Sequence, residues 1–239
     1  MSGGQAEPPV MSAPESASSV RQWLGRNAWR FVLLFAGVLL PLGVFAALAD
    51  EVHELEALHF DAPLLWRMHG LHGPQLDAFV VFVTRLGYEW FLIPADIGLV
   101  LLLAVRRRWR EAVFAAVALA GSALLNLGSK QFFQRDRPSL WESIAPESTY
   151  SFPSGHAMGS MTFACVIILL AWSTRWRWPV LASAVTFTVS VSLSRVYLGV
   201  HYPSDILAGW CAALAWVVSC FLIMFGRRLP LQSRTVLAR

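Results

Sequence analysis

The chain has 239 residues, of which 56% are hydrophobic and only 14% are charged, and its formal net charge is +4. This composition is too apolar for an ordinary soluble domain. The basic residues gather beside apolar runs, where they set membrane orientation, so the net charge does not indicate a nucleic-acid partner. The sequence therefore predicts an all-α, polytopic membrane protein.

Residues 1–30 are predicted to form a disordered cytoplasmic tail, because their first part is rich in Ser, Pro, Gly and Ala and lacks periodicity. The apolar run from Phe31 to Ala49 follows. As a helix, a run of this length spans about 28 Å, roughly one hydrocarbon core. Its last three residues, Ala47 to Ala49, resemble a signal-peptidase site. The run is longer than the ~7–15 residues of a usual signal core, which favours a retained anchor.

Residues 50–88 are predicted to form an extracytoplasmic or interfacial segment. They begin with acidic residues and contain four histidines, His53, His59, His69 and His72. No tight metal-ligand spacing accompanies these histidines, so we interpret them as surface or interfacial residues. The apolar stretch from Phe79 to Val83 is too short to cross a bilayer and predicts an interfacial or bundle-capping helix.

Five further apolar segments predict membrane helices and, with the first, give a bundle of six. They run from Trp90 to Val105, from Glu111 towards Lys130, from His156 to Trp172, from Pro179 to about Ser194 and from Pro203 to Phe225. The predicted transmembrane domain thus covers residues 31–228, and residues 229–239 form a second cytoplasmic tail. Asp96 lies within the second span, and we interpret this costly carboxylate as a structural partner or part of a kink.

Charge asymmetry predicts the orientation of the bundle. With the N-terminus in the cytoplasm, thirteen basic residues fall on the cytoplasmic side and six on the opposite side. The positive-inside rule therefore predicts that both termini are cytoplasmic. Four of the six exceptions belong to polar clusters at span ends or lie between their members: Lys130, Arg135, Arg137 and Arg195.

Three such polar clusters stand in order along the second half of the chain. They comprise Lys130 with Arg137 and Pro138, then Pro153 to His156, then Ser194 and Arg195 with His201 and Asp205. The third and fifth spans end at the outer face, whereas the fourth and sixth begin there. The predicted topology alone therefore brings the three clusters to one side of the membrane.

The local chemistry of the first two clusters suits an anion. Lys130 and Arg137 are two helical turns apart and share one face if the helix continues, while Pro138 favours a helix end at Arg137. Ser154 is a good N-cap and Gly155 permits close approach of the backbone. The positive end of the fourth span can then face an anion.

In the third cluster, Pro203 suits the first turn of the sixth span, which places His201 just before the helix and Asp205 inside it. Asp205 can orient one imidazole nitrogen of His201 and leave the other free to attack. Between the clusters, Arg135 and Asp136 are interpreted as pairing with each other.

Together the clusters resemble the signature of the type 2 phosphatidic acid phosphatase family, which shares its site with vanadium haloperoxidases. The match is complete at every defining position and covers roughly residues 75–225. The resemblance implies that His201 is the nucleophile that forms a phosphohistidine, that Asp205 orients it, and that His156 protonates the leaving oxygen. It also implies a set of phosphate-binding residues, namely Lys130, Arg137, Ser154, Gly155 and Arg195. The family works without a metal, so no metal and no cofactor are expected, and cations with helix-end amides stabilise the transferring phosphoryl group.

The resemblance therefore predicts a lipid phosphate phosphatase of the plasma membrane, with its site on the extracytoplasmic face. Undecaprenyl diphosphate is the favoured substrate, and phosphatidylglycerophosphate, phosphatidic acid and lipid A phosphates are the other candidates. A lipid phosphotransferase that uses the same intermediate is the main alternative. A lipid-binding or flipping protein without chemistry is disfavoured, because both histidines and the aspartate are present. A peroxidase is disfavoured because the family's haloperoxidases are largely soluble.

Overall fold

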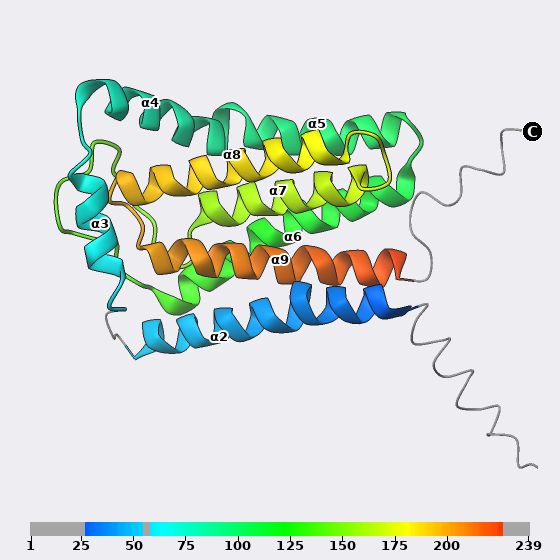
Figure 1. Ribbon diagram of the computed structural model, residues 1–239, viewed down its shortest axis with the longest axis horizontal. Coiled ribbons are helices and arrows are strands. Elements are labelled where there is room, and N and C mark those ends of the chain that lie inside the picture. The colour runs from blue at the N-terminus through cyan, green and yellow to red at the C-terminus, as the bar shows by residue number, and fades with distance from the viewer. Residues whose placement is uncertain (1–26, 55–57, 227–239) are drawn as a thin grey trace, which may run out of the picture.

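The computed structural model describes residues 27–54 and 58–226, and within these ranges it contains helices and no strands. Five helical segments are long and apolar enough to cross a membrane: Asn27–His53, Pro74–Val105, Trp109–Phe133, Arg177–Tyr197 and Pro203–Phe225. A shorter apolar helix, Gly155–Ala171, runs beside them. The predicted all-α membrane bundle of six is therefore confirmed (Figure 1). Most of the two predicted tails lies outside the described residues, but residues 27–30 already belong to the first helix.

The elements follow one another in a simple order. They are the π-helical turn η1 (Phe35–Leu39), α2 (Leu40–His53), α3 (Asp61–His69), α4 (Pro74–Arg85), the π-helical turn η2 (Leu86–Trp90), α5 (Leu92–Val105), α6 (Trp109–Phe133), α7 (Gly155–Ala171), α8 (Arg177–Tyr197) and α9 (Pro203–Phe225). The short helix α3 crosses one end of the bundle, and the described chain begins and ends at the other (Figure 1).

Both π-helical turns lie where a proline interrupts a long helix. A proline ring clashes with the carbonyl four residues before it. For Pro41 that residue is Gly37, within η1, and for Pro94 it is Trp90, the last residue of η2. The helix widens by one residue in these turns and then continues. The two prolines therefore change the hydrogen-bond pattern of their spans without ending them.

This continuity corrects the interpretation of the apolar stretch Phe79 to Val83. That stretch belongs to α4, which runs through η2 into α5 to make the single candidate span Pro74–Val105. It is not a separate interfacial or bundle-capping helix, and the second span begins well before Trp90. The apolar pattern fades at Arg85 and Glu89, but the chain stays helical across both.

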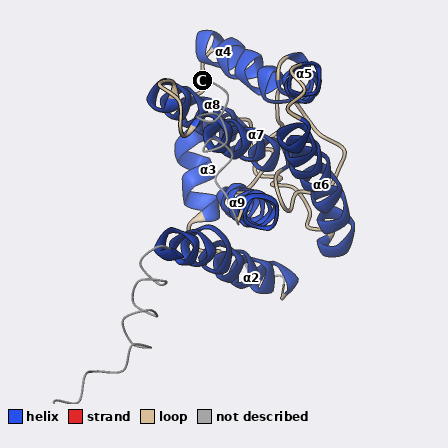
Figure 2. Cartoon of the chain, turned by 90° about the vertical axis from the view of Figure 1, so that its right-hand side faces the viewer, coloured by secondary structure: helices blue, strands red, loops and turns tan. Residues whose placement is uncertain are grey.

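The helix α7 lies at the centre of the bundle when it is viewed end-on, with the other long helices around it (Figure 2). It packs against α6, α8 and α9. Close approach of α9 to the start of α7 depends on Gly209, because a Cβ there would lie 3.0 Å from the carbonyl oxygen of Ser154. This contact sets the spacing between the second and third polar clusters.

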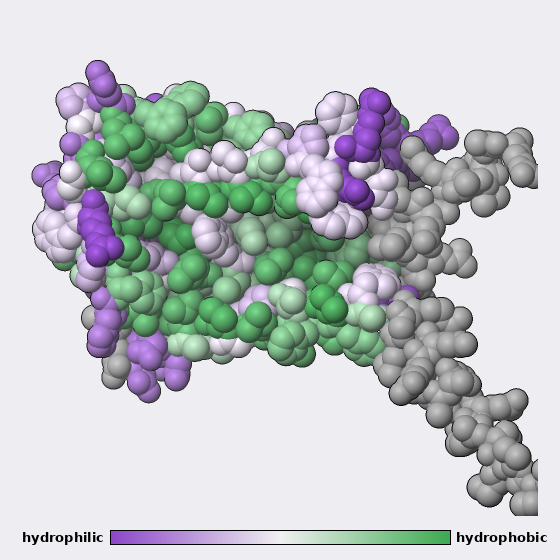
Figure 3. Space-filling model, viewed as in Figure 1, coloured by the Kyte–Doolittle hydropathy of each residue, from purple (hydrophilic) through white to green (hydrophobic). Residues whose placement is uncertain are grey.

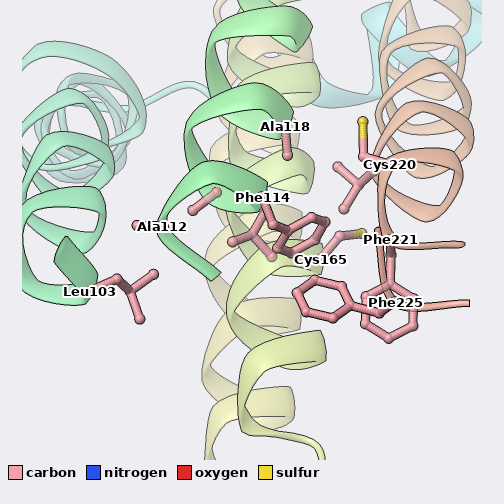
Figure 4. Close-up of a cluster of buried hydrophobic side chains, with 11 residues drawn as sticks. Leu103, Ala112, Phe114, Ala118, Cys165, Cys220, Phe221 and Phe225 are labelled. Atoms are coloured by element: carbon pink, nitrogen blue, oxygen red, sulfur yellow. The ribbon is translucent and has the colours of Figure 1, made fainter. Parts of the chain in front are cut away.

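The main hydrophobic core lies in the half of the bundle away from α3. Its centre is a group of aromatic rings, in which Phe114 of α6 meets Phe221 and Phe225 of α9 at 6.0 and 5.5 Å between ring centroids (Figure 4). Large apolar side chains also cover the outer surface of the bundle, and polar residues gather at its two ends (Figure 3). An apolar belt between polar ends is the surface that a bilayer requires.

Candidate active site

The polar clusters meet at the end of the bundle that α3 crosses. Here α6 and α8 end, α7 and α9 begin, and the loop of residues 134–154 covers them. Segments far apart in the sequence therefore deliver their side chains to one place, as the topology predicts. One local expectation is wrong. The helix α6 ends at Phe133, because Gln134 adopts a left-handed conformation with φ of 47°, so Arg137 lies in the loop and does not share a helical face with Lys130.

His201 and Asp205 lie at the centre of this end and are almost completely buried. The His201 Nδ1 is 3.3 Å from Asp205 Oδ2, and its Nε2 is 3.1 Å from Arg137 Nη1. Because a guanidinium can only donate, the Nε2 accepts, and the proton of the neutral ring is on Nδ1. The attacking nitrogen of the predicted nucleophile therefore carries its lone pair towards a cation.

Burial lowers the pKa of the His201 imidazole well below its usual value of 6.5, and the nearby charges of Arg137, Arg195 and Lys130 lower it further. A protonated ring would be desolvated and would face like charges on several sides. The surroundings thus keep His201 neutral, the form that can act as a nucleophile.

Asp205 is held by more partners than His201 alone. Its Oδ2 accepts hydrogen bonds from the Ser151 hydroxyl at 2.5 Å and from the backbone N–H of Tyr202 at 2.9 Å. The Tyr202 contact is a helix cap, because Tyr202 is the N-cap of α9 and Asp205 is its third residue. The other oxygen, Oδ1, accepts from Arg135 Nη1 at 2.5 Å.

Arg135 therefore does not pair with Asp136, as the sequence interpretation had it. It bridges Asp205 and Asp61, whose Oδ2 lies 3.0 Å from Arg135 Nη2. Asp61 opens α3 and also accepts the backbone N–H and the hydroxyl of Ser204, at 2.9 and 2.6 Å. No sequence signal points to Asp61, because it lies in a segment predicted to be interfacial and no spacing links it to the clusters.

The three predicted phosphate-binding cations share partners in the loop. The Lys130 ammonium donates to the Thr149 hydroxyl at 2.9 Å and to the Tyr150 carbonyl at 2.6 Å. Arg137 donates to the Thr149 carbonyl at 2.6 Å, and Arg195 donates to the Thr84 hydroxyl at 2.6 Å. The cations of α6, the loop and α8 therefore gather at one polar site, together with His201 and Asp205. Glu147 reaches the same polar site and pairs with Arg137 and Arg195.

The second cluster contributes a helix start. Ser154 is the N-cap of α7, but its hydroxyl makes no capping hydrogen bond and has no partner among the described residues, although it is fully buried. The Arg195 Nε is likewise buried without a partner in the described part of the chain. Two buried polar groups without protein partners, beside a helix N-terminus, suit an anionic ligand.

His156, in the first turn of α7, lies within electrostatic range of Arg195, His201 and Lys130. Its ring is 5.3 Å from the ring of Tyr88 in η2, measured between centroids. Tyr88 is exposed on the outside of the bundle. The predicted acid therefore lies on the side of the site closest to the apolar surface.

Two of the four histidines of residues 50–88 have a structural role. His69 stacks on Trp141 of the loop at 4.2 Å, and His72 stacks on Tyr197 at the end of α8 at 4.3 Å. Trp141 in turn packs against Gly199, where φ is +66° and a Cβ would lie 2.6 Å from the indole. This aromatic stack holds the short connection from α8 to His201. No group of three or more potential metal ligands occurs among the described residues.

Asp96 keeps one unexplained feature. Its Oδ1 is buried and has no hydrogen-bond partner within residues 27–54 and 58–226. It lies two residues after Pro94, in the part of α5 that follows the π-helical turn. Among the described residues, no hydrogen bond or ion pair joins Asp96 to the polar site.

Comparisons with known proteins identify the family of the chain. The PAP2 superfamily model matches residues 111–229. The chain is 33% identical over 147 residues to the undecaprenyl-diphosphatase of Sulfolobus acidocaldarius, a match that covers 59% of this chain and 67% of that protein. It is 29% identical over 178 residues to phosphatidylglycerophosphatase B of Bacillus subtilis, covering 71% and 86% of the two chains.

A solved structure shows the same fold. The crystal structure of a transmembrane PAP2 type phosphatidylglycerolphosphate phosphatase from Bacillus subtilis matches with a TM-score of 0.66 at 25% identity, over 78% of this chain and 98% of that chain. Aquifex aeolicus LpxE matches with a TM-score of 0.56 over 70% of this chain and 95% of the other. The chain belongs to the PAP2 superfamily and is a membrane phosphatase of the PAP2 type.

Proposed function

We propose that this protein removes a phosphate group from a membrane lipid through a phosphohistidine on His201. The observation that carries the proposal is the arrangement of this imidazole. Asp205 lies beside one ring nitrogen of His201, and the other ring nitrogen faces Arg137 at 3.1 Å. Lys130 and Arg195 belong to the same polar site. A neutral nucleophile among three cations suits attack on a dianionic phosphate ester.

In the first step, the His201 Nε2 attacks phosphorus, an N–P bond forms and the bond to the leaving oxygen breaks. His156 donates its proton to that oxygen as it leaves. Lys130, Arg137 and Arg195 stabilise the three equatorial oxygens, and the Ser154 hydroxyl and Gly155 N–H add donors. In this step, the Arg137 N–H that contacted Nε2 donates its hydrogen bond to a phosphoryl oxygen instead.

In the second step, water attacks the phosphohistidine while His156 takes up a proton from the water. The N–P bond breaks, inorganic phosphate leaves, and His201 returns to its neutral form. Asp205 stabilises the positive charge that the ring carries in the intermediate, in the same way that a buried aspartate supports a catalytic histidine elsewhere.

A lipid substrate fits the position of the site. Tyr88, which lies beside His156, is exposed on the outer surface of the bundle together with the neighbouring Trp90 and Phe91. A leaving group that emerges next to His156 thus meets apolar side chains, where a hydrocarbon chain can stay in the bilayer. The headgroup then reaches the polar site without the chain leaving the membrane.

We further propose that the site faces away from the cytoplasm in the plasma membrane. The described chain begins at Asn27 and ends at Gly226, both at the end of the bundle opposite the site. In the predicted topology, thirteen basic residues of the sequence fall on the side of the termini and six on the side of the site, which agrees with the positive-inside rule.

Undecaprenyl diphosphate is the proposed substrate, because a relative of 33% identity bears the name undecaprenyl-diphosphatase. The test is a panel of phosphate-release assays with the purified full chain in detergent, covering undecaprenyl diphosphate, phosphatidylglycerophosphate, phosphatidic acid and soluble phosphate esters. We expect the highest kcat/KM with the polyprenyl diphosphate. A phosphotransferase would instead pass labelled phosphate to an added lipid or sugar alcohol, and equal rates on all substrates would contradict the lipid assignment.

The pH dependence of hydrolysis follows from the lowered pKa of His201. The ring stays neutral until the pH falls well below 6.5, so we expect the acid-side decline of kcat/KM to lie below that value. In the complex, the phosphate dianion offsets the nearby cations that otherwise disfavour a protonated His156. On the alkaline side, the rate falls when that proton is lost, which gives a bell-shaped profile.

Profiles for two substrates with different phosphate pKa values check this expectation. The limb that belongs to His201 stays in place when the substrate is changed, whereas a limb caused by ionisation of the substrate moves. A rate that rises steadily with no acid-side limb would contradict the role of neutral His201.

A further inference from the structure

The loop carboxylate of Glu147 lies between two of the proposed phosphate-binding arginines. One of its oxygens pairs with Arg195 Nη2, and the other lies 3.4 Å from Arg137 Nη2. The Glu147 side chain is 29% exposed, whereas that of Arg195 is 2% exposed. Among the described residues, Glu147 is the only carboxylate paired with either guanidinium. It belongs to none of the three polar clusters, and the sequence did not single it out.

A carboxylate and a phosphate are the same kind of acceptor for a guanidinium, with oxygens that take up N–H donors in pairs. The Nη2 groups that hold Glu147 are therefore donors that a phosphate would use. Both anions cannot occupy them together, since their charges repel at this distance. A phosphate that binds at the polar site exchanges with the carboxylate of Glu147.

We propose that Glu147 is an internal competitor for the phosphate position, and that it sets how tightly the site holds a phosphate group. This inference rests on the proposed function, because it assumes that Arg137 and Arg195 bind the substrate phosphate. It assigns to Glu147 control of affinity, without contact to the reacting atoms.

The two arginines keep their positions when Glu147 leaves. Arg195 also donates from Nη1 to the Thr84 hydroxyl at 2.6 Å, and Arg137 donates from Nη1 to the Val200 carbonyl at 2.7 Å. These contacts orient both guanidinium groups independently of Glu147. The carboxylate lies on a loop and is partly exposed, so it can turn to solvent while the two arginines keep their positions.

Inorganic phosphate and a lipid phosphate must both displace the Glu147 carboxylate, but the effect on their binding differs. Free inorganic phosphate has nothing to offset the loss of the Glu147 pairs. A lipid phosphate is instead held at the membrane by its chain, which raises its effective concentration at the site. Glu147 therefore lets the product leave and keeps soluble phosphate out, while a lipid still binds.

The test is the variant Glu147→Gln, which keeps the size of the side chain and removes its charge. We expect the inhibition constants of inorganic phosphate and of vanadate, measured as competitors of lipid phosphate hydrolysis by the full chain, to fall by about tenfold or more. Glu147→Asp, with a shorter reach to the arginines, should give a smaller decrease. The matched control is Glu142→Gln in the same loop, where Glu142 is exposed, and its inhibition constants should equal those of the wild type.

Unchanged inhibition constants in Glu147→Gln would overturn the inference, and so would increased ones, which would mean that Glu147 holds the arginines in place. Titration calorimetry with vanadate separates this failure from failure of the proposed function. If the site does not bind phosphate at all, neither the wild type nor the variant takes up vanadate. If only the inference is wrong, the wild type and Glu147→Gln bind vanadate equally. Adding Arg195→Gln then weakens vanadate binding by each of them.

Discussion

Replacing His201 by Gln should stop phosphate release, with kcat reduced by about 10⁴-fold or more. The amide can still form a hydrogen bond to Asp205, but it provides no nitrogen lone pair that can attack phosphorus. In the proposed mechanism the reaction passes through a covalent intermediate, so the remaining residues cannot replace this step. The measurement is the release of inorganic phosphate from a lipid phosphate by the purified variant.

His59→Gln is the matched control, because His59 is exposed and should be dispensable. A second measurement looks for the intermediate itself. With a labelled substrate that has a good leaving group, His156→Gln should accumulate acid-labile phosphate on the protein, and the double variant with His201→Gln should not. Wild-type rates for His201→Gln would refute the assignment of the nucleophile.

Arg135→Gln should have the second largest effect, on both activity and stability. The arginine neutralises two buried carboxylates at once, at 2.5 Å from Asp205 and 3.0 Å from Asp61. Removing one partner of a buried ion pair typically destabilises a protein by about 3–5 kcal/mol. Loss of a group that orients a catalytic residue lowers activity by about 10–100-fold. We expect both losses, measured as the thermal unfolding midpoint in detergent and as kcat.

A double variant separates the two effects. Asp61→Asn added to Arg135→Gln removes one of the unpaired charges, so the unfolding midpoint should recover in part. The kcat should not recover, because Asp205 still lacks the guanidinium that fixes its Oδ1. Arg67→Gln, at an exposed position of α3, serves as the control. Full recovery of kcat together with stability would show that Arg135 acts on the fold alone.

The hydrophobic segments and the meeting of the polar clusters could be predicted from the sequence, because both depend on order along the chain. A membrane span can be recognised from its length and hydropathy. Because successive spans run in opposite directions, Lys130, His156 and Arg195 fall at the same end of the bundle. The prediction is weakest where the chain changes direction. The left-handed residue Gln134 ends α6 early, and nothing in its neighbourhood distinguishes it from a residue that continues the helix.

The partners of buried polar residues are the second feature that could not be predicted from the sequence. Arg135 was paired with its neighbour Asp136, whereas the structure pairs it with Asp61 and Asp205, the first of them 74 residues away in sequence. Such a choice depends on which carboxylates are buried together, and one sequence without its fold contains no record of that. The π-helical turn before Pro94 shows the same limit, since polar residues there suggested a boundary between two elements.

The contact of Trp141 with Gly199 has a consequence for the speed of the enzyme. Together with His69, His72 and Tyr197, it pins the connection that precedes His201, so the imidazole has little freedom to search for its attacking position. The entropy of that search is lost once, when the chain folds, and not again at each turnover. A lipid substrate that arrives by lateral diffusion therefore meets the proposed nucleophile, His201, already in its attacking position.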